Sequence, residues 1–292
     1  MGAGASGRLR VSAAASEADL IAIAVEAARL GGGLLAARAA RGVEADVASK
    51  STPTDLVSEA DLASQRAIRG LLAERRPDDG FLGEEEEEDE QGSSGLRWIV
   101  DPLDGTVNFL FGIPQWSVSV AVADASGTVA GAVYDPNREE LFTATRGGRA
   151  LLESADRSLV LVGRAVDPHA GQEDHEGEGA GGEGLPSAMV ATGLAYDADV
   201  RAAQGEVLAR LVAEVRDVRR FGSAALDLAW TAAGRYDAYY ERTVKAWDIA
   251  AGQLICERAG LSVVELPEQP DLPWGILVAR SGLAEALAGI VG

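Results

Sequence analysis

The sequence predicts a mixed α/β protein, in which a pair of helices precedes an antiparallel meander and strands then alternate with helices. Apolar residues at three- and four-residue steps predict a long amphipathic helix over residues 16–40, interrupted by Gly31-Gly32-Gly33. A second helix is expected from Ser58, because Ser58-Glu59-Ala60-Asp61 has capping-box spacing, and the segment from Pro77 to Gly80 ends it.

Short runs rich in β-branched and aromatic residues follow, and the turn residues between them indicate the meander. The expected strands are Leu96–Val100, Trp116–Ala123, Thr128–Tyr134 and Glu140–Thr145. After Arg146 the pattern changes, with strands expected at 159–162, 188–192, 218–221, 236–240 and 276–279 and helices at 200–215, 224–233, 248–259 and 283–291. We therefore expect one lobe at residues 12–150, a second at 151–292, and an insertion of disordered composition at 169–184.

Bulk composition restricts the classes of function. The chain has 292 residues, 47% of them hydrophobic, which suffices for one large domain or two fused lobes. A net charge of −20 argues against nucleic acid or an anionic membrane as a partner. No membrane span is expected, because no run of about eighteen apolar residues is present. The single cysteine, Cys256, cannot form an internal disulfide, so a cytoplasmic location is expected.

The segment from Trp98 to Phe109, Trp-Ile-Val-Asp-Pro-Leu-Asp-Gly-Thr-Val-Asn-Phe, contains the strongest chemical signal. An apolar strand leads into Asp101 and Asp104, which are hard oxygen ligands placed to share a divalent cation, while a proline stiffens the turn between them. Backbone N–H groups at Gly105 and Thr106 are placed to hold an anion. The pattern indicates a metal beside a phosphate, and a plain acidic turn is the alternative.

Three further acidic residues are candidates for the same site. Asp61 is either a functional residue or only the carboxylate of a capping box. Glu84 follows the apolar Phe81-Leu82-Gly83, although the acidic run Glu84–Glu90 also has the composition of a solvated loop. Asp248 stands at an expected helix start, where helix capping and metal binding are compatible.

Together these stretches resemble the inositol monophosphatase family of Mg²⁺-dependent, lithium-sensitive phosphatases, over about residues 14–288. The motifs that carry the resemblance are Lys50-Ser51-Thr52-Pro53-Thr54-Asp55-Leu56-Val57, Gly83-Glu84-Glu85, the Trp98–Phe109 segment, Gly222-Ser223-Ala224-Ala225 and Asp237-Ala238-Tyr239-Tyr240-Glu241. The stretch Val218–Asp227 is most similar to bacterial members of actinobacterial type. The resemblance implies a layered α-β-α-β-α sugar-phosphatase fold with two lobes, a metal site between them, and a homodimer.

For the metal site, the resemblance implies two or three Mg²⁺ ions. The implied ligands are oxygen donors: Glu84, Asp101 and the Leu103 carbonyl for the first ion, and Asp101, Asp104 and Asp248 for the second. A weaker third ion would lie near Glu84, with Asp61 and Lys50 in its outer surroundings. Such an arrangement suits Mg²⁺, which keeps waters and takes few protein carboxylates.

For catalysis, the resemblance implies that Glu84 and Thr106 position the attacking water, with Asp61 beside them. The phosphate would lie against the Gly105–Thr106 backbone, and sugar hydroxyls would meet Asp104, the Ala224 backbone and Glu241. The implied substrate is myo-inositol 1-phosphate, a small polyol phosphate. Histidinol phosphate, fructose 1,6-bisphosphate and 3′-phosphoadenosine 5′-phosphate remain alternatives, as does a regulatory binding protein that keeps the fold without catalysis.

Overall fold

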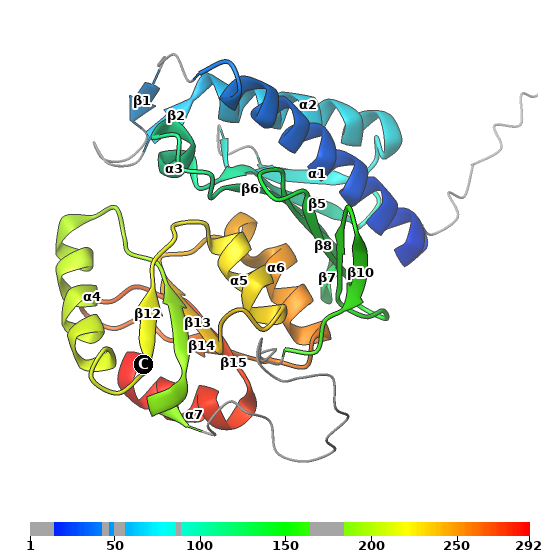
Figure 1. Cartoon of the computed structure of the whole chain (residues 1–292). Coiled ribbons are helices and arrows are strands. Elements are labelled where there is room, and N and C mark those ends of the chain that lie inside the picture. The colour runs from blue at the N-terminus through cyan, green and yellow to red at the C-terminus, as the bar shows by residue number, and fades with distance from the viewer. Residues whose placement is uncertain (1–14, 43–46, 50–55, 86–88, 164–183) are drawn as a thin grey trace, which may run out of the picture.

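The computed structural model describes residues 15–42, 47–49, 56–85, 89–163 and 184–292, which form layers in the order helix, sheet, helix, sheet, helix (Figure 1). Each large sheet buries both faces between helices, as a layered α/β domain requires. The layered α/β fold expected from the sequence is therefore confirmed. Lys50 and nearly all of the expected insertion at 169–184 lie outside the described residues.

The first sheet has eight strands in the order β10-β9-β8-β7-β6-β5-β3-β4. Its strands are β3 (Gly80–Gly83), β4 (Asp89–Glu90), β5 (Arg97–Asp104), β6 (Ser117–Asp124), β7 (Gly127–Asp135), β8 (Glu140–Thr145), β9 (Leu151–Ser154) and β10 (Arg157–Val160). Helices α1 (Glu17–Ala39) and α2 (Glu59–Arg75) cover its outer face, and a ribbon of β1 (Val47–Ser49) and β2 (Leu56–Ser58) joins them (Figure 1). The expected meander, β5 to β8, is confirmed by antiparallel pairing between successive strands.

The second sheet has five strands in the order β12-β11-β13-β15-β14. Its strands are β11 (Met189–Thr192), β12 (Asp217–Arg219), β13 (Ala238–Arg242), β14 (Ser262–Leu266) and β15 (Gly275–Ala279). Its helices are α4 (Ala198–Leu211), α5 (Ala224–Ala232), α6 (Ala246–Arg258) and α7 (Ser281–Val291). Helices α5 and α6 lie between the two sheets, while α4 and α7 cover the far face of the second (Figure 1).

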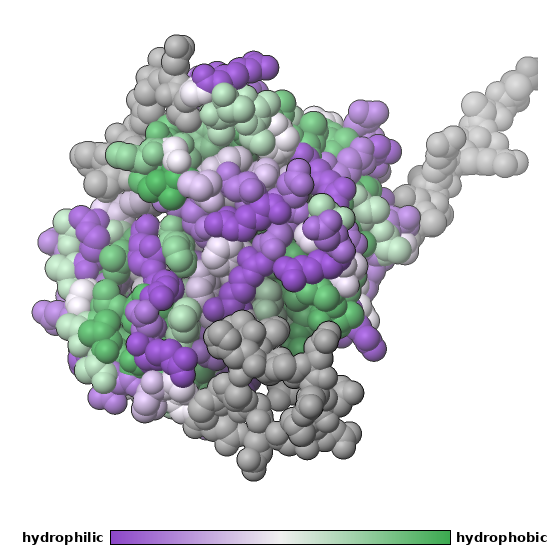
Figure 2. Space-filling model, viewed as in Figure 1, coloured by the Kyte–Doolittle hydropathy of each residue, from purple (hydrophilic) through white to green (hydrophobic). Residues whose placement is uncertain are grey.

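One hydrophobic core joins the two halves through the middle helical layer. It includes Val133 and Phe142 from the first sheet, Leu228 and Ile255 from α5 and α6, and Val278 from the second sheet. Arg235 pairs with Glu140 across the same junction, where hydrophilic residues gather on the face seen in Figure 2. The halves therefore share their core, and the geometry between them is held by packing.

The first sheet continues past the boundary expected at residue 150. Strand β9 pairs with β8, and β10 pairs with β9, so the strand expected at 159–162 belongs to the first sheet. The acidic run also differs from a uniform solvated loop. Glu85 is 2% exposed, and Asp89 and Glu90 form β4, which pairs with β3.

The expected interruption of the first helix is wrong. Helix α1 runs unbroken from Glu17 to Ala39, capped by Ser16, whose hydroxyl accepts the Asp19 N–H at 3.2 Å. Gly31 serves close packing instead, because a Cβ there would lie 2.8 Å from both Ile68 Cδ1 and Ser64 Oγ on α2.

By length and composition α1 could cross a membrane, a test that the core helix of a globular protein also passes. In this fold its apolar face contains Leu20, Ala24, Ala27 and Leu35, all buried within the core shared with α2 and the first sheet. Packing of that face accounts for the apolar composition of the helix.

Gly31→Ala is expected to lower the free energy of unfolding by about 1–2 kcal/mol, because overpacking against Ile68 and Ser64 outweighs the gain in helix propensity. Gly33→Ala is the matched control, since a Cβ there meets nothing within 4 Å. That control should stabilise the protein by up to about 1 kcal/mol. Denaturant unfolding measures both variants, and equal stabilisation by the two alanines would contradict the packing role of Gly31.

Candidate active site

Strand β5 and the short helix α3 (Thr106–Leu110) meet at the turn that carries the candidate metal ligands. Asp101 and Asp104 are buried, at 2% and 7% exposure. Gly105 makes the turn with a φ of 95°, which other residues rarely adopt, and the Gln115 carbonyl would lie 2.9 Å from any added Cβ. Local sequence therefore fixes the direction in which both carboxylates leave the strand.

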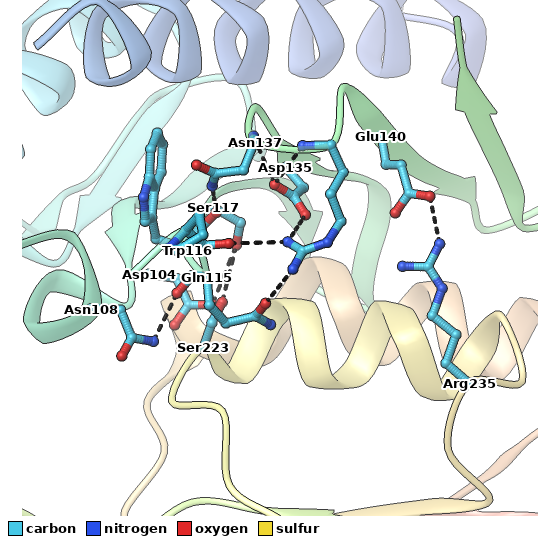
Figure 3. A network of polar contacts seen from close by, with 12 residues as sticks. Asp104, Asn108, Gln115, Trp116, Ser117, Asp135, Asn137, Glu140, Ser223 and Arg235 are labelled. Atoms are coloured by element: carbon cyan, nitrogen blue, oxygen red, sulfur yellow. Dashed lines mark hydrogen bonds and ion pairs between the residues drawn. The ribbon is translucent and has the colours of Figure 1, made fainter. Parts of the chain in front are cut away.

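The Asp104 carboxylate is bound by the start of α5, from the other half of the molecule (Figure 3). Backbone N–H groups of Ala224 and Ala225 donate to its two oxygens at 3.0 and 2.9 Å. The Ser223 hydroxyl also donates to it, and the Ser117 hydroxyl of β6 donates at 3.3 Å. A carboxylate at a helix N-terminus is favourably placed, because the helix dipole and unpaired N–H groups both attract it.

Asp61 reaches the same turn from the first turn of α2. It is fully buried, and its Oδ1 accepts the Thr106 hydroxyl at 2.8 Å. Ser64, one helical turn later, donates to the Pro102 carbonyl at 2.9 Å. Asp61 therefore contacts a proposed catalytic residue, which a carboxylate that only capped its own helix would not do.

Glu84 comes beside Asp101 through strand pairing. Strand β3 runs parallel to β5 with Gly83 opposite Val100, and the Glu84 N–H donates to the Val100 carbonyl at 3.1 Å. The next residue, Glu85, is fixed by Gln65, whose side-chain oxygen accepts the Glu85 N–H at 2.9 Å. Backbone hydrogen bonds thus hold both Glu84 and Glu85 in place, unlike residues of a solvated loop.

Asp248 comes beside Asp101 from the middle helical layer. Ser119 on β6 pairs opposite Asp101 and donates to the Trp247 carbonyl at 3.3 Å. The Asp248 carboxylate accepts the Lys245 N–H, so it caps α6, which begins two residues before the expected start. Asp248 therefore caps helix α6 and also lies close enough to Asp101 to repel its carboxylate.

The electrostatics of the cluster are unfavourable for the ionised carboxylates. Burial, followed by repulsion from Glu84, Asp104 and Asp248, raises the pKa of Asp101 well above its usual value. Burial and then Glu84 also raise the pKa of Asp248 well above its usual value. Burial raises the pKa of Asp104 less, because hydrogen bonds from the α5 N-terminus oppose it.

The donor set fits Mg²⁺, although no three acidic, histidine or cysteine side chains of the described residues are arranged as a ready-made coordination sphere. Mg²⁺ usually takes one or two carboxylates and keeps its remaining ligands as water or phosphate, so a convergent protein cage is not required. Asp101 accepts the Leu103 N–H at 3.0 Å, which orients that carboxylate. Glu84, Asp101, Asp104, Asp248 and the Leu103 carbonyl are the groups that would hold the ions.

Two residues expected to contact the substrate, Ala224 and Glu241, lie at the start of α5 and on β13. Glu241 lies within β13, rather than after the strand, and is partly buried with its Oε2 accepting the Tyr239 hydroxyl at 2.8 Å. The Ala224 N–H, expected to meet a sugar hydroxyl, donates to Asp104. Burial raises the pKa of Glu241 to about 7, against the opposing effects of Tyr239 and Arg220.

Sequence reasoning missed the residues that hold the site together. Ser117 and Ser223 bind Asp104, and the side-chain amide of Asn108 donates to the carbonyls of Gln115 and Phe221, 2.8 and 2.6 Å away (Figure 3). Ser223 and Asn108 lie within motifs that carry the family resemblance, and this position was the one sequence feature that could have identified them. Ser117 follows an expected strand start and carried no signal of its own.

Comparison with known proteins agrees with this geometry. The sequence profile of the inositol monophosphatase family matches residues 16–291. The inositol-1-monophosphatase of Mycobacterium leprae is 41% identical over 248 residues, covering 82% of this chain and 79% of that protein. A Pasteurella multocida protein named Nus factor SuhB is 38% identical over 242 residues, covering 82% and 83%.

Among solved structures, the extragenic suppressor protein suhB of Bartonella henselae superposes with a TM-score of 0.78 and 34% identity, covering 92% of this chain and 97% of that one. The profile match spans nearly the whole described fold, and the relatives align over most of their own lengths. The chain therefore belongs to the inositol monophosphatase family and is a phosphoric monoester hydrolase.

Proposed function

We propose that the protein hydrolyses myo-inositol 1-phosphate to inositol and phosphate in a Mg²⁺-dependent reaction with water as the nucleophile. One observation carries the metal dependence: burial, together with repulsion from neighbouring carboxylates that include Glu84, raises the pKa values of Asp101 and Asp248. Divalent cations would relieve that repulsion and, when bound, acidify a water and neutralise phosphate oxygens.

Three residues next to the first sheet, on α2, on α3 and just after β3, would orient the attacking water. The Thr106 hydroxyl has one proton, and Asp61 at 2.8 Å is a better acceptor for it than the Leu103 carbonyl at 3.1 Å. That donation leaves the Thr106 oxygen free to accept a hydrogen bond from the water, while Glu84 accepts a second. Asp61 is thus proposed to fix the direction of the Thr106 hydroxyl.

The phosphate is proposed to lie against the backbone of Gly105 and Thr106, at the start of α3. N–H groups in the first turn of a helix have no partner within the helix and attract anions. The protein as a whole carries a net charge of −20, so the anion would depend on local N–H groups and bound cations for its binding.

Substrate identity rests on Glu241. A partly buried carboxylate with a fixed orientation accepts hydrogen bonds from polyol hydroxyls, which favours inositol 1-phosphate over aryl or alkyl phosphates. Histidinol phosphate, fructose 1,6-bisphosphate and 3′-phosphoadenosine 5′-phosphate are the alternatives on the same chemistry.

A regulatory binding role is the second candidate, and the name of the Pasteurella relative, Nus factor SuhB, is the observation that favours it. Such a role requires no catalytic water, so turnover by the purified protein discriminates the two. A homodimer, lithium sensitivity and a cytoplasmic location are proposed on the resemblance and the single cysteine. Sedimentation of the protein as a monomer would contradict the homodimer. Turnover that Li⁺ does not inhibit would contradict lithium sensitivity.

Asp101→Asn is expected to abolish Mg²⁺-dependent hydrolysis of inositol 1-phosphate, because this carboxylate would bridge both ions. Asp124→Asn is the matched control, since Asp124 is on the neighbouring strand, where its carboxylate pairs with Arg146 near the surface and accepts the Ser126 N–H. Steady-state kinetics on both purified variants make the test, with circular dichroism to check folding. Near wild-type turnover by Asp101→Asn would show that the metal assignment is wrong.

Mg²⁺ is expected to raise the melting temperature, since an ion bound only by the native state stabilises it. Raised carboxyl pKa values mean that the metal-free folded protein loses stability as pH rises above the ordinary carboxyl range. The shift should therefore be larger at about pH 8 than at about pH 5. Asp248→Asn should reduce it, and thermal scans in chelator and in Mg²⁺ that coincide at both pH values would exclude the site.

Glu241→Gln is expected to lower kcat/KM for inositol 1-phosphate by about tenfold relative to that for an aryl phosphate, since a lost charged acceptor costs about 1.5 kcal/mol. The comparison of the two substrates separates recognition from chemistry. Equal losses on both would place Glu241 in the catalytic machinery. No loss on either would favour histidinol phosphate as the substrate.

A further inference from the structure

The carboxylate of Glu241 lies directly on the backbone of Gly193, at the end of β11. A Cβ added to Gly193 would come 1.9 Å from the carboxyl carbon of Glu241 and from both of its oxygens. No real side chain tolerates such a contact, so the carboxylate occupies the space that a side chain at this position would need. Strand pairing explains the approach, because β11 runs parallel to β13 with Thr192 opposite Tyr240, and the next residue on each strand is Gly193 and Glu241.

A second contact fixes the same carboxylate from the side. Tyr239 and Glu241 are two residues apart on β13, so their side chains leave the same face of the sheet. The Tyr239 ring is fully buried in the central core, and its hydroxyl donates to Glu241 Oε2 at 2.8 Å. Close packing around a fully buried ring restricts its movement, so the Tyr239 hydroxyl is held in place as a donor.

These two contacts remove the freedom that a glutamate side chain normally has. The Gly193 backbone limits the carboxylate on one side, while Tyr239 engages one of its two oxygens and leaves the other for a ligand. A preorganised acceptor binds a hydroxyl more tightly than a mobile one, because less conformational entropy is lost on binding. The orientation of Glu241 is thus determined by residues that would not touch the substrate.

We propose that Gly193 and Tyr239 are positioning residues that set the preference of this enzyme for polyol phosphates by holding the Glu241 carboxylate in one orientation. The proposal rests on the proposed function, in which Glu241 accepts hydrogen bonds from the hydroxyls of the substrate. Gly193 acts by having no side chain and Tyr239 by its hydroxyl, so each can be tested by a change of a few atoms.

The test is the selectivity ratio, kcat/KM for inositol 1-phosphate divided by kcat/KM for p-nitrophenyl phosphate, measured with Mg²⁺ on the full chain. Tyr239→Phe is expected to lower this ratio about fivefold to tenfold, through KM for the polyol substrate, since it removes a hydrogen bond to a charged group. Tyr134→Phe is the matched control. It removes the same hydroxyl from a partly buried tyrosine on β7 of the first sheet, which packs against a different core cluster, and should leave the ratio unchanged.

Gly193→Ala is expected to lower the ratio at least as far, because the added methyl group must displace the carboxylate. Gly205→Ala is its control, since a Cβ there meets nothing within 4 Å. In a Glu241→Gln background, Tyr239→Phe should cause no further fall in the ratio, because coupled residues are not additive. A purely structural role of the tyrosine would instead give additive losses on both substrates.

The outcomes separate this inference from the proposed function. If Glu241→Gln leaves the ratio unchanged, the polyol contact itself is wrong and the inference falls with it. If Glu241→Gln lowers the ratio while Tyr239→Phe does not, the inference alone is overturned. Should Gly193→Ala fail to fold, as thermal unfolding would show, Tyr239→Phe still decides the question.

Discussion

The carboxylate of Asp104 is the group on which the geometry of the site depends most. It ends β5 in the first half of the molecule, and the α5 N-terminus of the second half binds it through two backbone N–H groups and the Ser223 hydroxyl. Charge-assisted hydrogen bonds of this kind are stronger than neutral ones, and burial at 7% exposure strengthens them further. The contact therefore fixes the first half, which carries Asp101 and Thr106, against the second half, which carries Glu241.

That interaction also explains how a buried acidic cluster can exist at all. Ionised carboxylates taken out of water need compensating partners, and here three of them receive backbone N–H groups. Asp104 receives a helix N-terminus, Asp248 receives the N–H of Lys245, and Asp101 receives the N–H of Leu103. The compensation is incomplete, since burial and repulsion keep the pKa values of Asp101 and Asp248 well above normal. A bound cation would remove this remaining electrostatic cost, which would add to the proposed affinity of the site for metal.

Much of the fold, and the chemical character of the turn after β5, could be predicted from sequence because those signals are local. The capping-box pattern at Ser58 gave the start of α2, and alternating apolar residues gave the meander. The signals failed where a distant neighbour decides the outcome. The sequence predicts that Gly31 interrupts the helix, whereas the structure packs Ile68 against it. The sequence also predicts that Glu85 is solvated, whereas Gln65 binds its backbone N–H. Spatial partners of this kind leave no periodic trace along the chain.

In the proposed function, chemistry and recognition come from different sheets. The residues proposed to orient the water and most candidate ligands belong to the first sheet and its helices, whereas Glu241 and the residues that hold it belong to the second. The central helical layer keeps the two at a fixed separation, because α5 both binds Asp104 and packs in the core around Tyr239. Substitutions along β11 and β13 can therefore alter which alcohol is accepted without displacing a metal ligand. This division of labour gives a physical route by which one phosphatase fold could serve several phosphate monoesters.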